Sequence, residues 1–139
     1  MLLGLKKRGF GVDKYNGIGG KVNQGELIEE AAIRECEEEI GVTPLDISQV
    51  AIIQFFQVPW KGTQVDTEVH VYECTHWTGE PKESEEMKPQ WFAIKDVPYN
   101  QMWDDDQYWL PRVLAGEHLR AEFIFDDQAK VIKQTITNI

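Results

Sequence analysis

The segment from Glu26 to Ile40 limits what this chain can fold into, because its two faces differ sharply at the 3.6-residue period of an α-helix. One face is an apolar stripe made of Ile33, Cys36 and Ile40. The opposite face is a carboxylate patch made of Glu35, Glu38 and Glu39. Gly41 follows directly and can end a helix in a left-handed conformation. The pattern predicts an amphipathic helix that packs its apolar face on the rest of the protein.

The carboxylate patch has two interpretations. Like charges three and four residues apart repel by a few tenths of a kcal/mol per pair, and Arg34, four residues before Glu38, offsets only part of this. A solvated helix face accounts for most acidic patches of this kind. A divalent-cation site accounts for a minority, since hard oxygen ligands on a rigid element suit Mg²⁺ or Mn²⁺. Periodicity alone favours the solvated face.

Residues at fixed distances around this helix change the balance. They are Gly20, Glu26, Arg34, Glu35, Glu38, Glu39 and Gly41. Seven such matches arise by chance on the order of once in 10⁸ starting positions. The spacing resembles the Nudix box, with one departure at Cys36, where the family usually has a bulky aliphatic residue. A P-loop at Gly20-Lys21 is excluded, because Tyr15 and Val22 stand where that motif needs Gly and Ser or Thr.

The resemblance implies an enzyme that carries out substitution at phosphorus with bound Mg²⁺, for which Mn²⁺ is a possible substitute. Bound divalent ions neutralise a triphosphate and lower the pKa of an attacking water. The metal ligands implied are the carbonyl of Gly19 and the carboxylates of Glu35, Glu38, Glu39 and Glu86. The same four carboxylates form the expected catalytic set. For Glu86, an acidic surface loop is the alternative interpretation.

Two further stretches, Lys6–Gly11 and Met102–Trp109, resemble the Nudix branch that hydrolyses oxidised purine nucleoside triphosphates, and the similarity extends over nearly the whole chain. The substrate-binding residues that it implies are Lys6, Phe10, Asn16, Phe55, Trp103, Asp105, Asp106 and Trp109. Independently, flat apolar rings suit a purine face and carboxylates suit its polar edge. Adjacent carboxylates do not both ionise easily, so one pKa is expected to rise. The alternative is that the Asp residues cap a helix and the Trp residues fill the core.

The function implied is conversion of 8-oxo-dGTP, 2-oxo-dATP and similar nucleotides to the monophosphate and pyrophosphate, which cleans the nucleotide pool. A Nudix enzyme for unmodified or methylated triphosphates, or for diphosphate conjugates, is the main alternative. Asp104 and Thr67 keep it open, because they stand where relatives of this branch have Pro and Met. A non-catalytic nucleotide-binding module is a third interpretation, which the intact set of Glu residues disfavours.

Length and composition suit one domain over residues 1–139, since a chain with 42% hydrophobic residues can bury one continuous core. A second, shorter helix is expected from about Asp104 to Leu114. The expected strands are Val50–Gln57, Thr67–Thr75, Gln90–Ile94, Ala121–Phe125 and Val131–Ile136. We therefore expect a mixed α/β (α+β) Nudix fold, with a mixed sheet between helices. Relatives carry an additional strand before the segment matching Met1–Gly4, so the sheet is expected to lack its first strand.

A net charge of −10 argues against binding to nucleic-acid polymers, which requires clustered Lys and Arg. No apolar run approaches the roughly 20 residues that span a bilayer, and no secretory signal begins the chain. We therefore expect a cytoplasmic protein that binds a nucleotide and no membrane. A monomer is expected, with a dimer through an open sheet edge as the alternative. Cys36 and Cys74 are expected to be reduced thiols.

Overall fold

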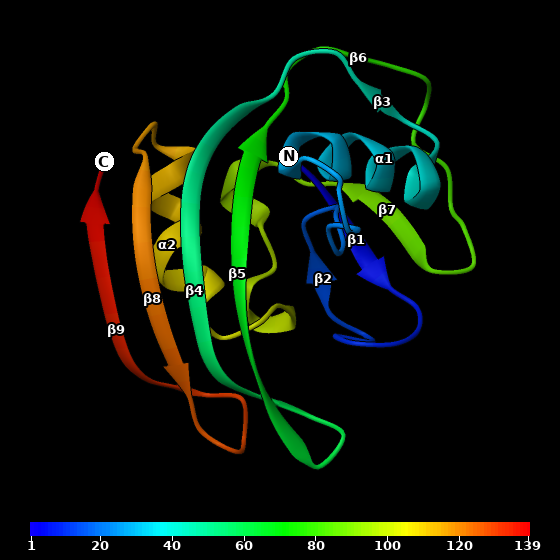
Figure 1. Cartoon of the computed structure of the whole chain (residues 1–139). Helices are drawn as coiled ribbons and strands as arrows, with labels where there is room; N and C mark the ends of the chain where they lie inside the picture. Colours follow the sequence, from blue (N-terminus) through cyan, green and yellow to red (C-terminus); the bar gives the residue numbers. More distant parts are fainter. The chain divides into compact units, whose positions relative to one another are not determined.

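A computed structural model describes all residues, 1–139, and the chain forms two compact units (Figure 1). The first unit contains residues 1–48 and 74–102, and the second contains residues 49–73 and 103–139. No helix is long and apolar enough to cross a membrane. That the whole chain is one domain stays a prediction.

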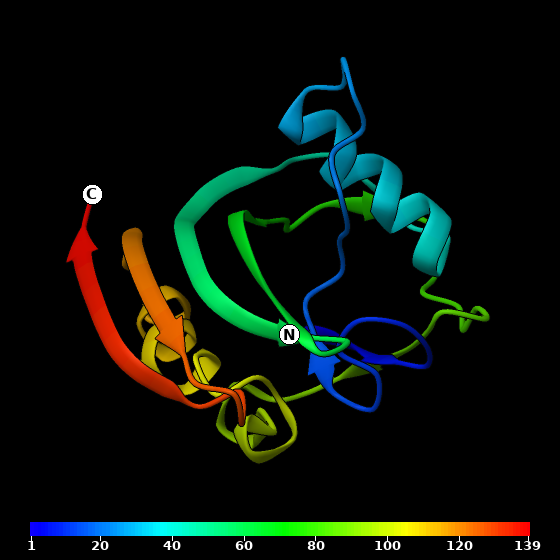
Figure 2. The same ribbon diagram turned by 60° about the horizontal axis from the view of Figure 1, so that its bottom comes forward.

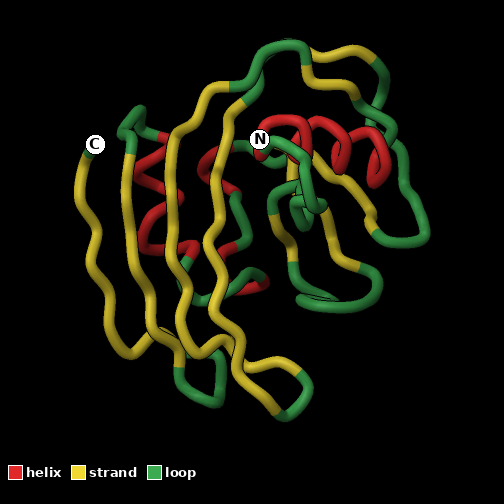
Figure 3. The backbone as a smooth tube through the Cα atoms, viewed as in Figure 1, coloured by secondary structure: helices red, strands yellow, loops and turns green.

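The first unit contains two small antiparallel sheets. In the three-stranded sheet, β1 (Leu2–Lys6) is central, with β2 (Tyr15–Asn16) on one side and β7 (Met87–Trp91) on the other. The second sheet pairs β3 (Thr43–Pro44) with β6 (Trp77–Thr78). Two short 3₁₀ helices, η1 (Ile94–Asp96) and η2 (Tyr99–Gln101), follow β7. Figure 3 shows how much of this unit is loop between these elements.

Helix α1 (Ile28–Ile40) lies against β3 and β7 in this unit, and the turned view of Figure 2 shows its full length. It ends as predicted, because Gly41 has φ 71° and its N–H donates to the carbonyl of Glu37. Ile40 packs with Val42 and Met87 in the core of the unit. The predicted start at Glu26 is two residues too early, since Glu26 comes before the helix and its N–H donates to the carbonyl of Asn23 at 3.0 Å.

The two-faced helix pattern is wrong at one position. Glu39 belongs to the predicted carboxylate face, yet its side chain is buried with only 4% exposed, next to the buried Ile40. Glu38 is exposed, as a solvated face requires. Adjacent helix residues differ by about 100° in direction, so Glu39 lies at the border between the two faces. The packing of this unit brings that border inside.

The second unit is a four-stranded mixed sheet in the order β5-β4-β8-β9. Its strands are β4 (Ser48–Trp60), β5 (Thr63–Glu73), β8 (Leu119–Phe125) and β9 (Val131–Asn138). β4 and β8 are parallel, whereas β8 and β9 are antiparallel. Lys61 and Gly62, both with positive φ, form the two-residue turn that joins β4 to β5. Helix α2 (Asp106–Leu114) lies against β8.

The core of the second unit follows from the two-residue period of its strands. Along β8, Leu119, Ala121, Phe123 and Phe125 are buried, while Arg120 and Glu122 between them are exposed. This alternation places one face of the sheet inside and fixes the register of the strand.

Two strands of the first unit differ from the predictions. Leu2–Lys6 is absent from the predicted strands, although β1 is central in its sheet. The predicted strand Gln90–Ile94 is misplaced, because β7 covers Met87–Trp91 and Ile94 begins η1. The register explains the shift: β1 pairs Lys6 with Met87 and Leu2 with Trp91, so the residues after Phe92 have no partner strand.

Candidate functional site

Glu39 is the buried acidic residue of the first unit. One of its carboxylate oxygens, Oε2, is buried without any hydrogen-bond partner. The pKa of Glu39 is raised to about 7, mainly by burial; the charge of Lys6 opposes the rise, and the carboxylates of Glu35 and Glu86 contribute to it. These shifts show that Lys6, Glu35 and Glu86 are all within electrostatic reach of Glu39. An unpaired buried carboxylate is costly, so the arrangement favours a bound cation.

Glu35 is held close to the glycine-rich loop that precedes α1. A Cβ atom added to Gly20 would stand 2.5 Å from the carboxylate carbon of Glu35, so any other residue here would displace this carboxylate from its position. Gly19, whose carbonyl is an expected ligand, is the preceding residue and is half-buried. From the sequence, Gly20 is only one member of a motif, whereas the structure gives it a steric role.

Arg34 binds more carboxylates than its spacing from Glu38 indicates. It forms a bidentate pair with Glu26 at 2.7 and 3.0 Å, and its Nη1 donates to Glu35 at 2.9 Å and to Glu38 at 3.1 Å. Its Nη2 also donates to the carbonyl of Lys21 at 2.9 Å. One guanidinium therefore ties the loop to the helix and offsets the repulsion along its acidic face.

Glu86 lies immediately before β7, and its backbone is fixed by a hydrogen bond from the N–H of Lys7 to its carbonyl at 2.8 Å. Its carboxylate accepts a hydrogen bond from Nη2 of Arg8 at 3.2 Å. The charge of Glu86 also contributes to the raised pKa of Glu39, so Glu86 lies within electrostatic reach of that carboxylate. Glu35, Glu38, Glu39 and Glu86 together are the acidic set, and the role of Glu86 in it stays a prediction.

The acidic set suits a divalent ion, although it is not a closed cage. No group of three or more His, Cys, Asp and Glu side chains is already gathered into a metal-binding geometry. Mg²⁺ needs no such cage, because it usually binds one or two carboxylates and completes its shell with water and substrate phosphates. The unpaired Oε2 of Glu39 beside Glu35 is consistent with this mode of binding.

Three predicted substrate-binding residues also lie in the first unit. Lys6 ends β1 and acts electrostatically on Glu39, so it is brought to the acidic set. Asn16 is exposed on β2, and its Oδ1 accepts a hydrogen bond from the N–H of Gly17 at 3.0 Å. Phe10 is 41% exposed in the loop between β1 and β2.

The second unit contains a pair of buried carboxyl groups. Asp105 and Asp106 are 3% and 4% exposed. Oδ2 of Asp105 accepts a hydrogen bond from Nε1 of Trp109 at 2.8 Å, whereas Oδ2 of Asp106 is buried without a partner. Burial raises the pKa of Asp105 to about 6. Burial and the adjacent charge of Asp105 raise the pKa of Asp106 to about 8, in the direction expected from the sequence.

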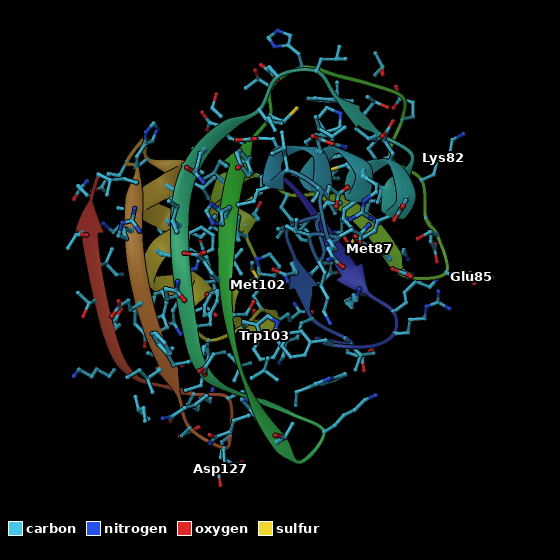
Figure 4. All side chains as sticks on the ribbon, in the orientation of Figure 1. Lys82, Glu85, Met87, Met102, Trp103 and Asp127 are labelled. Atoms are coloured by element: carbon cyan, nitrogen blue, oxygen red, sulfur yellow. The ribbon has the colours of Figure 1, made fainter.

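Aromatic rings stand on the same unit as these carboxyl groups. Phe55 stacks on Phe123 with a centroid distance of 5.9 Å and lies 6.0 Å from Phe125. Trp103, labelled in Figure 4, meets Phe125 edge to face at 6.3 Å and is only half-buried. Trp109 is 7% exposed. An indole that keeps part of its surface exposed next to packed rings can stack on a flat ligand.

The interpretation of Asp104–Asp106 as a helix cap is confirmed in position but not in its side-chain hydrogen bond. Asp105 is the N-cap residue of α2, and its side chain makes no capping hydrogen bond. Asp104 serves another element: its Oδ2 accepts a hydrogen bond from the N–H of Val131 at 2.8 Å, and its Oδ1 accepts one from the side chain of Gln107 at 2.9 Å. Asp104 therefore ties the start of α2 to β9, a role that the sequence pattern did not indicate.

Several known proteins are similar to this chain. The NUDIX domain family matches residues 4–113. The oxidized purine nucleoside triphosphate hydrolases of Mus musculus and Danio rerio are each 40% identical to the chain over all of its 139 residues and 87% of their own length. The 8-oxo-dGTP diphosphatase of Escherichia coli is 29% identical over 55% of each chain. The MutT protein of Bacillus halodurans shares the fold, with a TM-score of 0.80 over 97% of this chain and 88% of its own at 23% identity.

Proposed function

Because this chain belongs to the Nudix family of hydrolases, we propose that it converts oxidised purine nucleoside triphosphates to the monophosphate and pyrophosphate. The support for this substrate class is the 40% identity, over the whole chain, to hydrolases of that name from mouse and zebrafish. The observation that carries the chemistry is the buried, unpaired oxygen of Glu39 beside Glu35 and Glu86. The proposal treats residues 1–139 as one Nudix domain.

Nudix hydrolases generally need a divalent metal ion, and we propose Mg²⁺ here, with Mn²⁺ as a substitute. Glu35 and Glu39 are the first ligands in this proposal, and Glu38, Glu86 and the carbonyl of Gly19 complete the protein's share. When bound, the ion supplies neutralisation of phosphate charge and a lowered pKa for the attacking water.

The surrounding residues orient this acidic set. Arg34 holds the carboxylate of Glu35 at 2.9 Å, and Gly20 leaves the space in which that carboxylate lies. Burial keeps bulk water from Glu39, which strengthens its attraction for a cation. Lys6 adds a positive charge near Glu39 that suits an anionic phosphate.

For the base, we propose that the buried pair Asp105 and Asp106 forms hydrogen bonds with the polar edge of an oxidised purine while Trp103 stacks on its face. Near neutral pH, the raised pKa of Asp106 keeps this group protonated, so that it can donate a hydrogen bond, whereas Asp105 can accept one. Exchange of the proton between the two groups would reverse the donor and acceptor pattern. That exchange would admit both 8-oxo-guanine and 2-oxo-adenine. Phe10, Asn16, Phe55 and Trp109 are the further residues proposed to form the base site.

Product analysis tests the reaction class. The purified chain is incubated with 8-oxo-dGTP and Mg²⁺, and the products are separated by anion-exchange chromatography. The proposal expects 8-oxo-dGMP and pyrophosphate in equal amounts. Release of inorganic phosphate with 8-oxo-dGDP would contradict it, as would the absence of any product.

Two Asn variants test the proposed hydrogen bonds from Asp105 and Asp106 to the purine base. Asp105→Asn and Asp106→Asn each fix one side of the donor and acceptor pattern, so each is expected to change the ratio of kcat/KM for 8-oxo-dGTP and 2-oxo-dATP. Asp127→Asn, in an exposed turn, is the matched control. If both site variants kept the wild-type ratio, the proposed role of the pair would be wrong.

A further inference from the structure

Two basic residues after β1, Lys7 and Arg8, hold the acidic loop of residues 83–86 that leads into β7. Lys7 Nζ pairs with Glu83 at 2.6 Å and donates to the carbonyl of Ser84 at 2.8 Å. Arg8 reaches further along the loop, to Glu85 at 3.5 Å and Glu86 at 3.2 Å. Figure 4 shows Glu85 at the outer end of this loop and Met87 turned into the unit. The side chains of Lys7 and Arg8 therefore bind different parts of one loop.

The backbone around Glu86 is already fixed without Arg8. The N–H of Lys7 donates to the carbonyl of Glu86, and the hydroxyl oxygen of Ser84 accepts from the N–H groups of Glu86 and Met87 at 3.3 Å each. What these bonds leave free is the rotation of the Glu86 side chain. The guanidinium of Arg8 contacts one carboxylate oxygen, Oε1, and so restricts this rotation.

We propose that Arg8 is a positioning residue that holds the carboxylate of Glu86 ready to bind a divalent cation together with Glu39. This inference rests on the proposed function, in which Glu86 is a metal ligand. Oε1 is occupied by Arg8, which leaves Oε2 for the ion. The charge of Glu86 contributes to the raised pKa of Glu39, so the two carboxylates lie within electrostatic reach of each other. Hydrogen bonds to a ligating carboxylate fix its orientation, and their loss typically weakens metal binding or activity by about 10- to 100-fold.

A role in stability does not account for the Arg8–Glu86 pair. Both side chains are exposed, Arg8 at 59% and Glu86 at 45%, and exposed ion pairs contribute little to folding. Arg8→Gln is therefore expected to leave the melting temperature unchanged. An effect of this variant on cation affinity would then report on the carboxylate and not on the fold.

The test is direct titration of Mn²⁺ into the full chain without nucleotide, with free Mn²⁺ followed by electron paramagnetic resonance. Arg8→Gln is expected to raise the Kd for Mn²⁺ by about tenfold, and Arg8→Lys is expected to raise it less. In a Glu86→Gln background, Arg8→Gln should have no further effect. Lys7→Gln is the matched control, because it removes a basic side chain that binds the same loop but leaves the Glu86 carboxylate paired with Arg8. This variant should bind Mn²⁺ like the wild type.

Each other outcome overturns the inference in a distinguishable way. If Glu86→Gln weakens Mn²⁺ binding and Arg8→Gln does not, Arg8 has no positioning role and the proposed metal site still stands. If Lys7→Gln weakens binding as much as Arg8→Gln, order in the loop is responsible instead of the guanidinium. If Glu39→Gln and Glu86→Gln both bind Mn²⁺ like the wild type, the proposed metal site itself fails.

Discussion

Replacing Asp106 by Asn should remove a pH dependence of stability that the buried carboxyl group causes. Its pKa is about 8 in the folded protein, against 3.8 for an exposed Asp in an unfolded chain. Between these values the folded protein binds about one proton more than the unfolded chain. Stability from this group is therefore fully present below pH 3.8 and is lost as pH rises through 8. Asp106→Asn cannot lose a proton, so its stability should not follow this decline.

The change in the free energy of unfolding can be calculated from the one extra proton that the folded protein binds. One pKa unit corresponds to about 1.4 kcal/mol, so the free energy of unfolding of Asp106→Asn should rise by about 2.7 kcal/mol relative to the wild type between pH 5 and pH 7. Urea denaturation followed by tryptophan fluorescence at pH 5, 6, 7 and 8 measures this difference. Asp127→Asn, exposed in a turn, should show none. Parallel stability curves for Asp106→Asn and the wild type would refute the claim that Asp106 is protonated at neutral pH.

Two further substitutions test contacts around the acidic residues. Gly20→Ala should displace the carboxylate of Glu35 and lower kcat/KM by about 10- to 100-fold, with little change in melting temperature. Gly17→Ala, which has open space around it, should keep the wild-type kcat/KM. Equal activity of both variants would show that Gly20 has no steric role. Trp109→Phe removes the hydrogen-bond donor to Asp105. The pKa of Asp105 is about 6, so the lost bond is to a charged carboxylate at pH 8 and to a neutral one at pH 5, and the free energy of unfolding should fall by about 1–3 kcal/mol more at pH 8. A loss independent of pH would show that only packing was affected.

The sequence predicted the elements with a strong period and a clear end signal. Helix α1 ends at Gly41 as predicted, since a left-handed C-cap depends on local conformation alone. The parallel and antiparallel pairs of the second sheet confirm a mixed sheet, and the strands Ala121–Phe125 and Val131–Ile136 lie inside β8 and β9. The short strands β2, β3 and β6 were not predicted, because a strand of two residues leaves no periodic pattern in the sequence.

What the sequence could not predict depends on contacts between distant residues. The burial of Glu39 results from the packing of α1 in its unit, which overrides the solvated face that its period indicates. The bond from Val131 to Asp104 joins residues 27 positions apart, and the pair of Arg8 with Glu86 joins residues 78 positions apart. No spacing rule covers such distances. The motif nevertheless indicated the acidic set, because Glu35, Glu38 and Glu39 share one short helix.

The most direct test of the proposed function is Mg²⁺-dependent pyrophosphate release from 8-oxo-dGTP, 2-oxo-dATP, dGTP and dATP by the wild type and by Glu39→Gln. A hydrolase of the proposed class should show a higher kcat/KM for the two oxidised nucleotides. Glu39→Gln should lose at least about 100-fold in kcat/KM, because this variant lacks the buried carboxylate that is proposed to hold the ion. Equal kcat/KM for all four nucleotides would contradict the proposed substrate class. Undiminished activity of Glu39→Gln would contradict the proposed metal site.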